Sequence, residues 1–325
     1  MKKNEISQAL MVHCRCNFSN MIVGVYDMVL SCRFQREYDK NISYPIIING
    51  KLKEKGSKFI IKRADLNLYI FYEVTDIIIT DYYALFKYHV YKTIPETCEY
   101  DYFLEVNYIN EDQCDFYFCF IFDKKLYFSE KEIQDEIKFR KNIFKNIEIS
   151  LRKFEILKIA NVYTTINCKI ELIFDVLKNM KMINKYCHIL ANEVKYKGEI
   201  LKVNNLIHLI EYIGKIKHES IAKVKKFNIT KDNITKECNI ELTFQNDKNS
   251  LSYFSKTKIV IIIYEYNDFC SIYLFYFFYN TQKNKESYSN FIKSKQRELT
   301  KFKNIIENYN ENYFKNGVKV KDKDY

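Results

Sequence analysis

Histidine, cysteine and acidic residues are the side chains that could carry catalysis or hold a metal ion in this chain. Its histidines are His13, His89, His188, His208 and His218. None of them has a Cys, Ser or Asp partner at the spacing of a catalytic triad or a metal site. The sequence also has no glycine-rich phosphate loop, no G-x-S-x-G motif and no H-E-x-x-H motif. We therefore predict no catalytic residues and no cofactor, with an enzyme as the less favoured alternative.

The cysteines mostly lie within strand-like patterns, as small buried apolar residues would. Cys14 and Cys16 share one face of a predicted strand, but the second pair of ligands that a zinc site needs is missing. The first residues lack the apolar segment of a signal peptide. No apolar run reaches the roughly 18 residues of a membrane span, because Glu265, Asn267 and Asp268 interrupt the best candidate. We therefore predict no metal site and a reducing, cytoplasmic location.

The net charge of +11 comes entirely from the second half of the chain. Residues 1–156 hold 23 Lys and Arg against 23 Asp and Glu, whereas residues 157–325 hold 29 against 18. This asymmetry could attract an anionic membrane surface, although an A+T-rich genome would give the same lysine excess on a solvated face. The lysine-rich segment 215–226 lacks the interleaved aromatic residues of a base-stacking surface, so nucleic acid is not a favoured partner.

The most informative feature is a segment that occurs twice. Residues 104–123, LEVNYINEDQCDFYFCFIFD, are echoed by residues 260–279, VIIIYEYNDFCSIYLFYFFY, at a step of 156 residues. This step aligns Tyr108 with Tyr264 and Cys114 with Cys270. In both copies the pattern predicts two aromatic strands joined by a turn, with a long charged helix after them. An internal repeat of this kind predicts two copies of one domain.

A second echo, at a step of 148 residues, relates residues 21–31 to residues 169–179, both of which have the spacing of a buried helix. The same step carries Gly50 onto Gly198 and Gly56 onto Asn204. Gly and Asn are the residues that tolerate a left-handed backbone. Each pair therefore predicts the same turn in the two copies.

The alternation of apolar and polar residues predicts which side chains face the interior of each domain. Glu105 and Asn107 mark the outer face of one strand, and the 156-residue step transfers that parity to the second copy. The side chains expected to face inward and line a ligand site are Leu104, Val106, Tyr108, Phe118, Phe120, Leu242, Phe244, Ile262, Tyr264, Leu274 and Tyr276. Tyr108 and Tyr264 would offer their hydroxyls to a ligand head group. Alternatively all of these residues are plain core, because 25 Phe and 28 Tyr could fill the interior.

Each copy closes with a long amphipathic helix. In residues 130–154 one stripe contains Ile133, Ile137, Phe144, Ile147, Leu151 and Phe154. In residues 286–314 the stripe contains Tyr288, Ile292, Leu299, Phe302, Ile306, Tyr309 and Tyr313. Both spacings follow the helical period. A helix this long needs a partner of similar length, and the preceding sheet is the candidate in each copy.

This order of strand, short helices, antiparallel strands and long closing helix resembles the START-like helix-grip superfamily, also called SRPBCC or the birch-pollen-allergen type. The residues that carry the resemblance are the VYD and IFD helix motifs, the Gly50 and Gly198 turns and the two closing helices. It implies an α+β fold of two tandem helix-grip domains, each a curved antiparallel sheet wrapped around a long C-terminal helix. The domains would span residues 1–156 and 157–314, before a disordered basic tail at 315–325.

In that superfamily the space between the sheet and the closing helix is commonly a cavity for lipids, sterols or other apolar ligands. The resemblance therefore implies binding or transfer of a lipid or other apolar small molecule. A protein-interaction or co-chaperone module with filled cavities is the first alternative, and a cyclase- or hydrolase-type enzyme is the second. A void between sheet and helix would favour ligand binding, whereas a titratable pair inside it would favour an enzyme.

Overall fold

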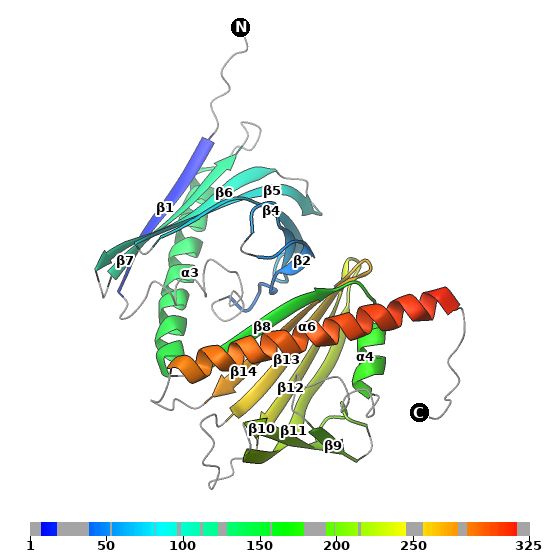
Figure 1. Cartoon of the computed structure of the whole chain (residues 1–325). Helices are drawn as coiled ribbons and strands as arrows, with labels where there is room; N and C mark the ends of the chain where they lie inside the picture. Colours follow the sequence, from blue (N-terminus) through cyan, green and yellow to red (C-terminus); the bar gives the residue numbers. More distant parts are fainter. Residues whose placement is uncertain are drawn as a thin grey trace. The chain divides into compact units, whose positions relative to one another are not determined.

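The computed structural model describes residues 8–17, 39–52, 54–80, 82–95, 99–110, 113–122, 129–156, 158–178, 193–197, 199–213, 216–244, 256–278 and 285–316. Within these ranges the chain forms two seven-stranded antiparallel sheets, each followed by a long helix (Figure 1). The predicted architecture of two sheet-and-helix domains is confirmed. The helix expected at residues 21–31, the turn at Gly198 and the tail after residue 316 lie outside the described residues.

The first sheet has the strand order β1-β7-β6-β5-β4-β3-β2, so the first strand pairs with the last one. Its elements are β1 (Gln8–Asn17), β2 (Ile46–Asn49), β3 (Lys58–Arg63), β4 (Leu68–Ile79), β5 (Tyr83–Ile94), β6 (Tyr100–Asn110), β7 (Gln113–Phe122) and the helix α3 (Glu130–Ile156). The sheet is strongly curled (Figure 1). Shifts of register between β4 and β5 and between β6 and β7 contribute to the curl, since a bulge bends its strand.

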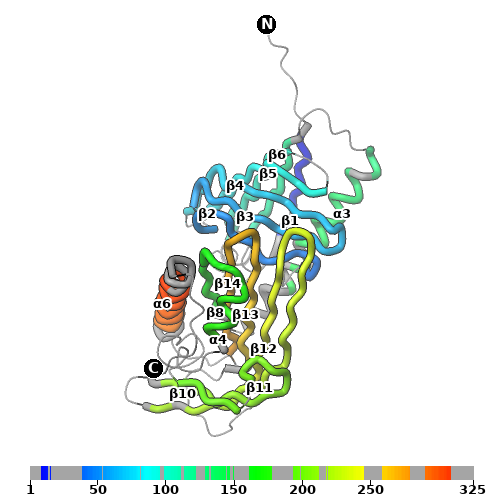
Figure 2. The backbone as a smooth tube through the Cα atoms, turned by 90° about the vertical axis from the view of Figure 1, so that its right-hand side faces the viewer, coloured from blue at the N-terminus to red at the C-terminus, as the bar shows by residue number. Residues whose placement is uncertain are grey.

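The second sheet repeats this order as β8-β14-β13-β12-β11-β10-β9. Its elements are β8 (Lys158–Ile166), α4 (Ile170–Lys178), β9 (Glu193–Tyr196), β10 (Leu206–Ile213), β11 (Ile216–Lys231), β12 (Thr235–Phe244), β13 (Lys256–Tyr266), β14 (Phe269–Phe278) and α6 (Lys285–Asn316). Figure 2 shows α6 nearly end-on beside β8 and β14, and α6 contacts β8 and α4. The lysine-rich segment 215–226 falls mostly in β11, which lies between β10 and β12.

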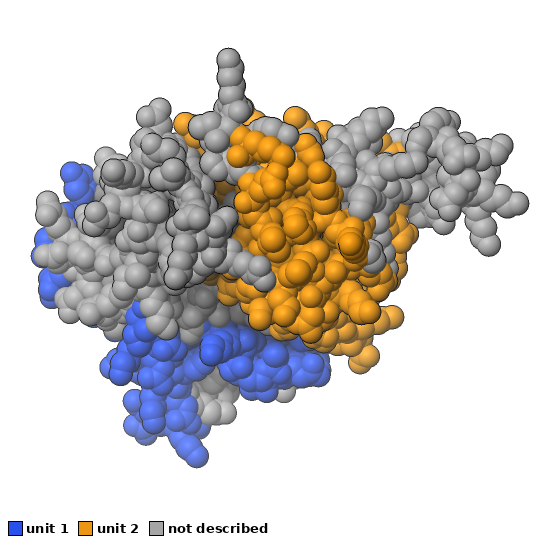
Figure 3. Space-filling view, turned by 90° about the horizontal axis from the view of Figure 1, so that it is seen from below, with its two compact units in different colours: residues 1–155 blue, residues 156–325 orange. Residues whose placement is uncertain are grey.

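The chain divides into two compact units, Met1–Glu155 and Ile156–Tyr325 (Figure 3). One turn demonstrates their equivalence in detail, because Gly56 has a φ of 82° and Asn204 has a φ of 70°. The Gly56 N–H donates to the Val74 carbonyl at 2.7 Å, and the Asn204 N–H donates to the Val224 carbonyl at 2.8 Å. The left-handed turn predicted from the 148-residue step is therefore confirmed at this pair.

The core of the second unit lies between the sheet and α6. Leu299, Phe302 and Ile306, which belong to the predicted stripe of α6, are 0–1% exposed. They pack with inward side chains of β11 to β14 and with α4 in one continuous cluster. The stripe is thus confirmed here, whereas the side chains of Phe144, Ile147, Leu151 and Phe154 in α3 lie outside the described set.

The hairpin that repeats most clearly in sequence differs in register between the two units. In β6–β7 the pairing shifts between Tyr108 and Asn110, which leaves Ile109 as a one-residue bulge. The β13–β14 hairpin pairs regularly from Tyr266–Phe269 onward through the middle of the strands. Because side chains alternate along a strand, one inserted residue moves every later side chain to the other face. Residues of β6 and β13 that are 156 positions apart therefore face opposite sides of their sheets.

The prediction that Ile262 and Tyr264 face inward is wrong for this reason. The cluster beneath α6 takes Ile259, Ile261 and Ile263 from β13. Ile262 and Tyr264 lie on the opposite face, where Ile262 pairs with Tyr273 and the Tyr264 ring meets the Tyr273 ring edge-on at 6.5 Å. Tyr108 and Tyr264 consequently do not occupy equivalent positions. None of the helices in the described ranges has the length and apolar character that crossing a bilayer demands.

Candidate functional site

A cavity of about 80 Å3 lies between the sheet and α3 in the first unit. Six aromatic side chains from β3 to β7 form one wall: Phe59, Tyr72, Tyr88, Tyr100, Tyr102 and Phe120. Four isoleucines, Ile42, Ile61, Ile70 and Ile143, and the α3 residue Phe139 complete the apolar lining. Two arginines, Arg63 from the end of β3 and Arg140 from α3, are the charged residues of this lining.

The aromatic wall is a continuous series of ring contacts. Tyr88 stacks on Tyr102 with centroids 5.6 Å apart, and Tyr102 stacks on Phe120 at 5.0 Å. Tyr72 meets Tyr88 edge-on at 6.0 Å and stacks on Phe59 at 5.2 Å. Such contacts hold the rings in fixed orientations, because offset and edge-on pairs are the favoured geometries. The wall therefore presents a preformed aromatic surface with tyrosine hydroxyls as polar groups.

Arg140 brings a guanidinium group to this wall from α3. Its Cζ lies 4.5 Å from the Phe120 ring centroid and 5.6 Å from that of Phe118. Its Nε donates to Glu136 Oε1 at 2.6 Å, one helical turn earlier, and the side chain is 20% exposed. Burial acts to lower the pKa of Arg140, but the charge of Glu136 and the neighbouring Tyr102 outweigh it, so the net pKa is raised. Arg140 is therefore a permanent cation inside a largely aromatic site.

Arg63 brings a second guanidinium group to the same cavity from the end of β3. Its Cζ lies 4.6 Å from the Phe139 ring centroid, and Arg140 Cζ lies 5.4 Å from the same ring. Arg63 binds Asp65 with Nη2 at 2.9 Å from Oδ2, and its side chain is 15% exposed. The hydrogen bond from Arg63 holds the pKa of Asp65 below its usual range. The two cations thus share one aromatic neighbour at the cavity.

The corresponding helix position of the second unit contains an internal ion pair. Lys295 of α6 is only 7% exposed in its side chain, and its Nζ lies 3.0 Å from Glu298 Oε2 and 3.6 Å from Glu211 Oε1. The same Nζ lies 6.0 Å from the Tyr276 ring centroid and 5.7 Å from that of Phe291. Here a cation of the closing helix meets carboxylates that the unit itself supplies.

The residues predicted to line a ligand site in the first unit lie in different places in the structure. Phe120 lines the cavity, and Phe118 contacts Arg140 beside it. Leu104 and Val106 are both 3% exposed but are core residues apart from the lining. Tyr108 lies at the end of the β6–β7 hairpin, where its ring is 5.6 Å from that of Tyr82.

In the second unit the predicted residues are core. Leu242, Leu274 and Tyr276 belong to the buried cluster beneath α6, and Phe244 packs against that cluster. Ile262 and Tyr264 are also buried, but on the opposite face of the sheet. The structure therefore brings these side chains together as packing residues.

Neither Arg63 nor Arg140 was predicted from the sequence as a ligand-site residue, although the sequence contained a signal for Arg140. The helix stripe advances by seven positions from Ile137 to Phe144, and again from Ile292 to Leu299. A residue three positions into such a gap lies on the same helix face. A step of 155 residues aligns the two stripes and places Arg140 on Lys295. A cation in the same gap of both stripes marks a position that faces the sheet.

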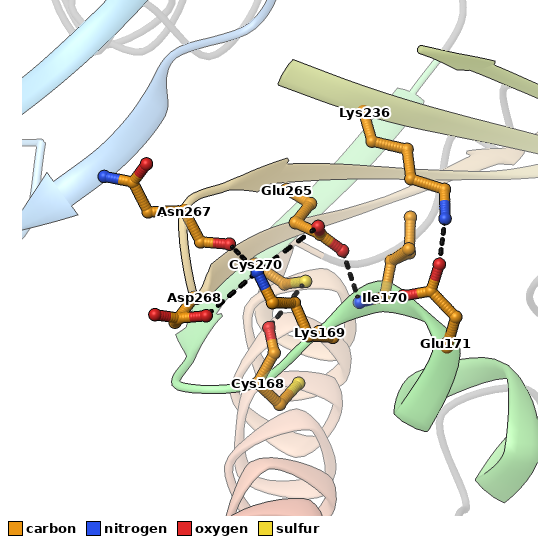
Figure 4. Close-up of polar contacts among 9 residues, drawn as sticks. All are labelled: Cys168, Lys169, Ile170, Glu171, Lys236, Glu265, Asn267, Asp268 and Cys270. Atoms are coloured by element: carbon orange, nitrogen blue, oxygen red, sulfur yellow. Dashed lines mark hydrogen bonds and ion pairs between the residues drawn. The ribbon is translucent and has the colours of Figure 1, made fainter. Parts of the chain in front are cut away.

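A second polar cluster lies where α4 begins in the second unit (Figure 4). Glu265 Oε2 accepts the backbone N–H of Ile170 at 2.7 Å, which caps the first turn of the helix. Lys169 Nζ donates to the Asn267 carbonyl at 2.7 Å and lies 2.9 Å from Asp268 Oδ1. The hydrogen bond to Asp268 raises the pKa of Lys169. These contacts attach α4 to the β13–β14 hairpin.

The remaining contacts of this cluster also serve attachment. Lys236 pairs with Glu171, and this hydrogen bond lowers the pKa of Glu171. Cys270 Sγ lies 3.2 Å from the Cys168 carbonyl oxygen. The neighbouring Cys168 side chain and burial raise the pKa of Cys270, so its thiol stays protonated and unreactive. The cluster is therefore an anchor for α4.

The histidines of the described residues include two whose rings lie within hydrogen-bonding distance of a carboxylate. His13 Nε2 lies 3.1 Å from Asp115 Oδ1, and its ring stacks on Tyr117 at 4.7 Å. His89 Nδ1 lies 2.9 Å from Asp101 Oδ1. Within the described ranges, no group of three or more His, Cys, Asp or Glu side chains is arranged to hold a metal ion.

Comparison with known proteins gives structural neighbours only. No family model and no curated protein matches the sequence. The di-domain ARO/CYC protein StfQ from the steffimycin biosynthetic pathway is 5% identical over 84% of this chain and 85% of its own, with a TM-score of 0.40. Ara h 8.0201 is 10% identical over 46% of this chain and 99% of its own, with a TM-score of 0.37. A START superfamily protein from Mycobacterium smegmatis is 7% identical over 45% and 99%, also with a TM-score of 0.37.

The fold assignment rests on the topology itself. In each unit a seven-stranded antiparallel sheet pairs its first strand with its last and is closed by a long C-terminal helix. In the first unit this helix covers the aromatic wall, and in the second it covers the buried cluster. The chain is thus a tandem of two domains with the helix-grip fold, in which a long C-terminal helix lies against an antiparallel sheet.

Proposed function

We propose that the first unit binds a small, largely aromatic or apolar molecule in the cavity between its sheet and α3. The observation that carries this proposal is the preformed aromatic wall around a void of about 80 Å3. Apolar surface that leaves water gains about 25 cal/mol per Å2. A concave, mostly apolar space with a few polar groups is the usual form of a small-molecule site.

The size of the cavity favours a small ligand over lipid transfer. Pockets for drug-sized molecules measure about 300–1,000 Å3, several times the volume of about 80 Å3 seen here. An entire lipid would require α3 to move away from the sheet. A small molecule, or the end group of a larger one, needs no such movement.

The lining also favours binding over catalysis. Its described members are isoleucine, phenylalanine, tyrosine and arginine, with no carboxylate, imidazole or thiol among them. A hydrolase or cyclase mechanism that uses a carboxylate or histidine base would need such a group within reach of the substrate. The buried apolar cluster of the second unit fits the alternative role of a structural or interaction module.

A fluorescent apolar probe tests the proposal on the full chain. N-phenyl-1-naphthylamine should bind with about one site per chain by inserting its phenyl group, and Ile61→Phe should block this uptake by filling the cavity. Leu209→Phe, at the equivalent position of the second unit, is the matched control and should leave uptake unchanged. Absence of uptake, together with native mass spectra free of any co-purified small molecule, would contradict the proposal.

A further inference from the structure

The guanidinium groups of the first cavity have hydrogen-bonding capacity left over. A guanidinium carries five N–H donors. Arg140 donates to Glu136 through Nε, and Arg63 donates to Asp65 through Nε and Nη2. Their remaining N–H groups have no hydrogen-bond acceptor among the residues that the structure describes. No nitrogen of either guanidinium is both buried and without a partner, so these N–H groups are accessible to a ligand that enters the cavity.

The second unit identifies what kind of acceptor is missing. The 148-residue step that holds at the Gly56 and Asn204 turns places Arg63 on Glu211. Both residues lie near the ends of equivalent strands, β3 and β10. On the helix side, the aligned stripes place Arg140 on Lys295. In the second unit the strand residue near Lys295 is therefore a carboxylate, Glu211. In the first unit the strand residue near Arg140 is a second cation, Arg63.

The cavity lining of the first unit therefore has an arginine, and no carboxylate, at the position that Glu211 occupies in the second unit. Lys295 Nζ reaches Glu211 Oε1 at 3.6 Å and Glu298 Oε2 at 3.0 Å, and the Lys295 side chain is 7% exposed. In the first unit the carboxylates of Asp65 and Glu136, which pair with Arg63 and Arg140, are 32% and 35% exposed. Neither carboxylate is part of the cavity lining.

Resting on the proposed function, we propose that the ligand of the first unit is a small aromatic or apolar acid. Its carboxylate or phosphate group binds Arg63 and Arg140, in the place that Glu211 takes in the second unit. Arginine suits this role because its planar fork binds carboxylate and phosphate oxygens in pairs. The apolar part of the ligand lies against Tyr102 and Phe120, whose rings border the Arg140 guanidinium.

A matched pair of probes tests the acid group on the full-length protein. Phenylacetate and its neutral analogue phenylacetamide have nearly the same shape and differ in charge. Calorimetric titration should give an affinity for phenylacetate about tenfold or more above that for phenylacetamide. Arg63→Gln and Arg140→Gln should each remove most of this preference, so that the two probes bind with similar affinity. Glu211→Gln, at the position equivalent to Arg63, is the control and should change neither affinity.

The outcomes separate this inference from the proposed function. Equal binding of both probes, insensitive to either arginine substitution, would overturn the acid-ligand inference and leave apolar binding intact. Failure of both probes and of N-phenyl-1-naphthylamine would overturn the proposed function itself. Uptake of N-phenyl-1-naphthylamine with no binding of phenylacetate would also overturn the acid class. If Arg140→Gln proves unfolded by circular dichroism, Arg63→Gln decides the question, because Arg63 lies at a strand end.

Discussion

The cavity beside Ile61 and the packed core around Leu209 predict opposite changes in stability when each residue is replaced by a larger one. Ile61 lines the cavity in β3 and is 4% exposed, whereas Leu209 lies in the core cluster and is 1% exposed. The 148-residue step makes the two positions equivalent. Replacing each by Phe therefore adds the same ring to a cavity in one case and to a filled core in the other.

The expected magnitudes follow from packing. At Leu209 the added atoms have no space, and overpacking a filled core costs about 1–3 kcal/mol. At Ile61 the ring can enter a void of about 80 Å3, where each buried CH2-sized group contributes about 0.8 kcal/mol of stabilisation. Ile61→Phe should therefore be neutral or slightly stabilising, while Leu209→Phe should be clearly destabilising.

Hydrogen exchange read by mass spectrometry can assign each change to its unit, because peptides from the two units are distinguishable. Urea unfolding supplies the free energies, with each unit treated as a separate transition if two are seen. Equal destabilisation by both substitutions would refute the difference in packing. Retained probe uptake in a folded Ile61→Phe variant would refute the location of the site.

Three further predictions concern residues whose roles the structure separates. Phe302→Ala should lower the free energy of unfolding by about 3–5 kcal/mol, measured in urea, because the side chain is 1% exposed beneath the sheet; a loss below about 1 kcal/mol would contradict this packing. Tyr264→Phe should change stability by about 1 kcal/mol at most. It should also leave uptake of N-phenyl-1-naphthylamine unchanged, because Tyr264 belongs to the second unit and the proposed site lies in the first; reduced uptake would contradict that location of the site. The hydrogen bond from Arg15 lowers the pKa of Asp115, so Asp115 contributes stability above its unfolded pKa of about 3.9, which is lost as pH falls through the lower folded value. Asp115→Asn should therefore destabilise the protein at pH 7 and progressively less below about pH 4, and a difference independent of pH would count against this ion pair.

Local pattern was sufficient for the duplication and for much of the secondary structure. The 148-residue step anticipated the left-handed turns at Gly56 and Asn204, since only a few residue types accept that backbone. The helical period anticipated the buried stripe of Leu299, Phe302 and Ile306. These features depend on residues close together in the chain, so their signal survives in the sequence.

Sequence similarity to β6 could not show which side chains of β13 face the interior. Ile109 forms a bulge in the first hairpin, whereas the second hairpin closes regularly around Asn267 and Asp268. Whether a residue bulges depends on the pairing partner across the turn and on the curl of the sheet. The similarity of the two segments therefore concealed a change of face at Tyr264.

The sequence by itself determined that this protein has two copies of one sheet-and-helix domain, because periodicity and turn residues act over short distances. The tertiary structure was needed to locate the cavity in the first unit and to identify Arg63 and Arg140 as the charged residues of its lining. Arg63 and Arg140 come from a strand end and a helix far apart in the chain, and the closing of α3 over the sheet brings them to one aromatic ring. In the second unit the same closure joins Lys295 to Glu211 and leaves an ion pair in that place.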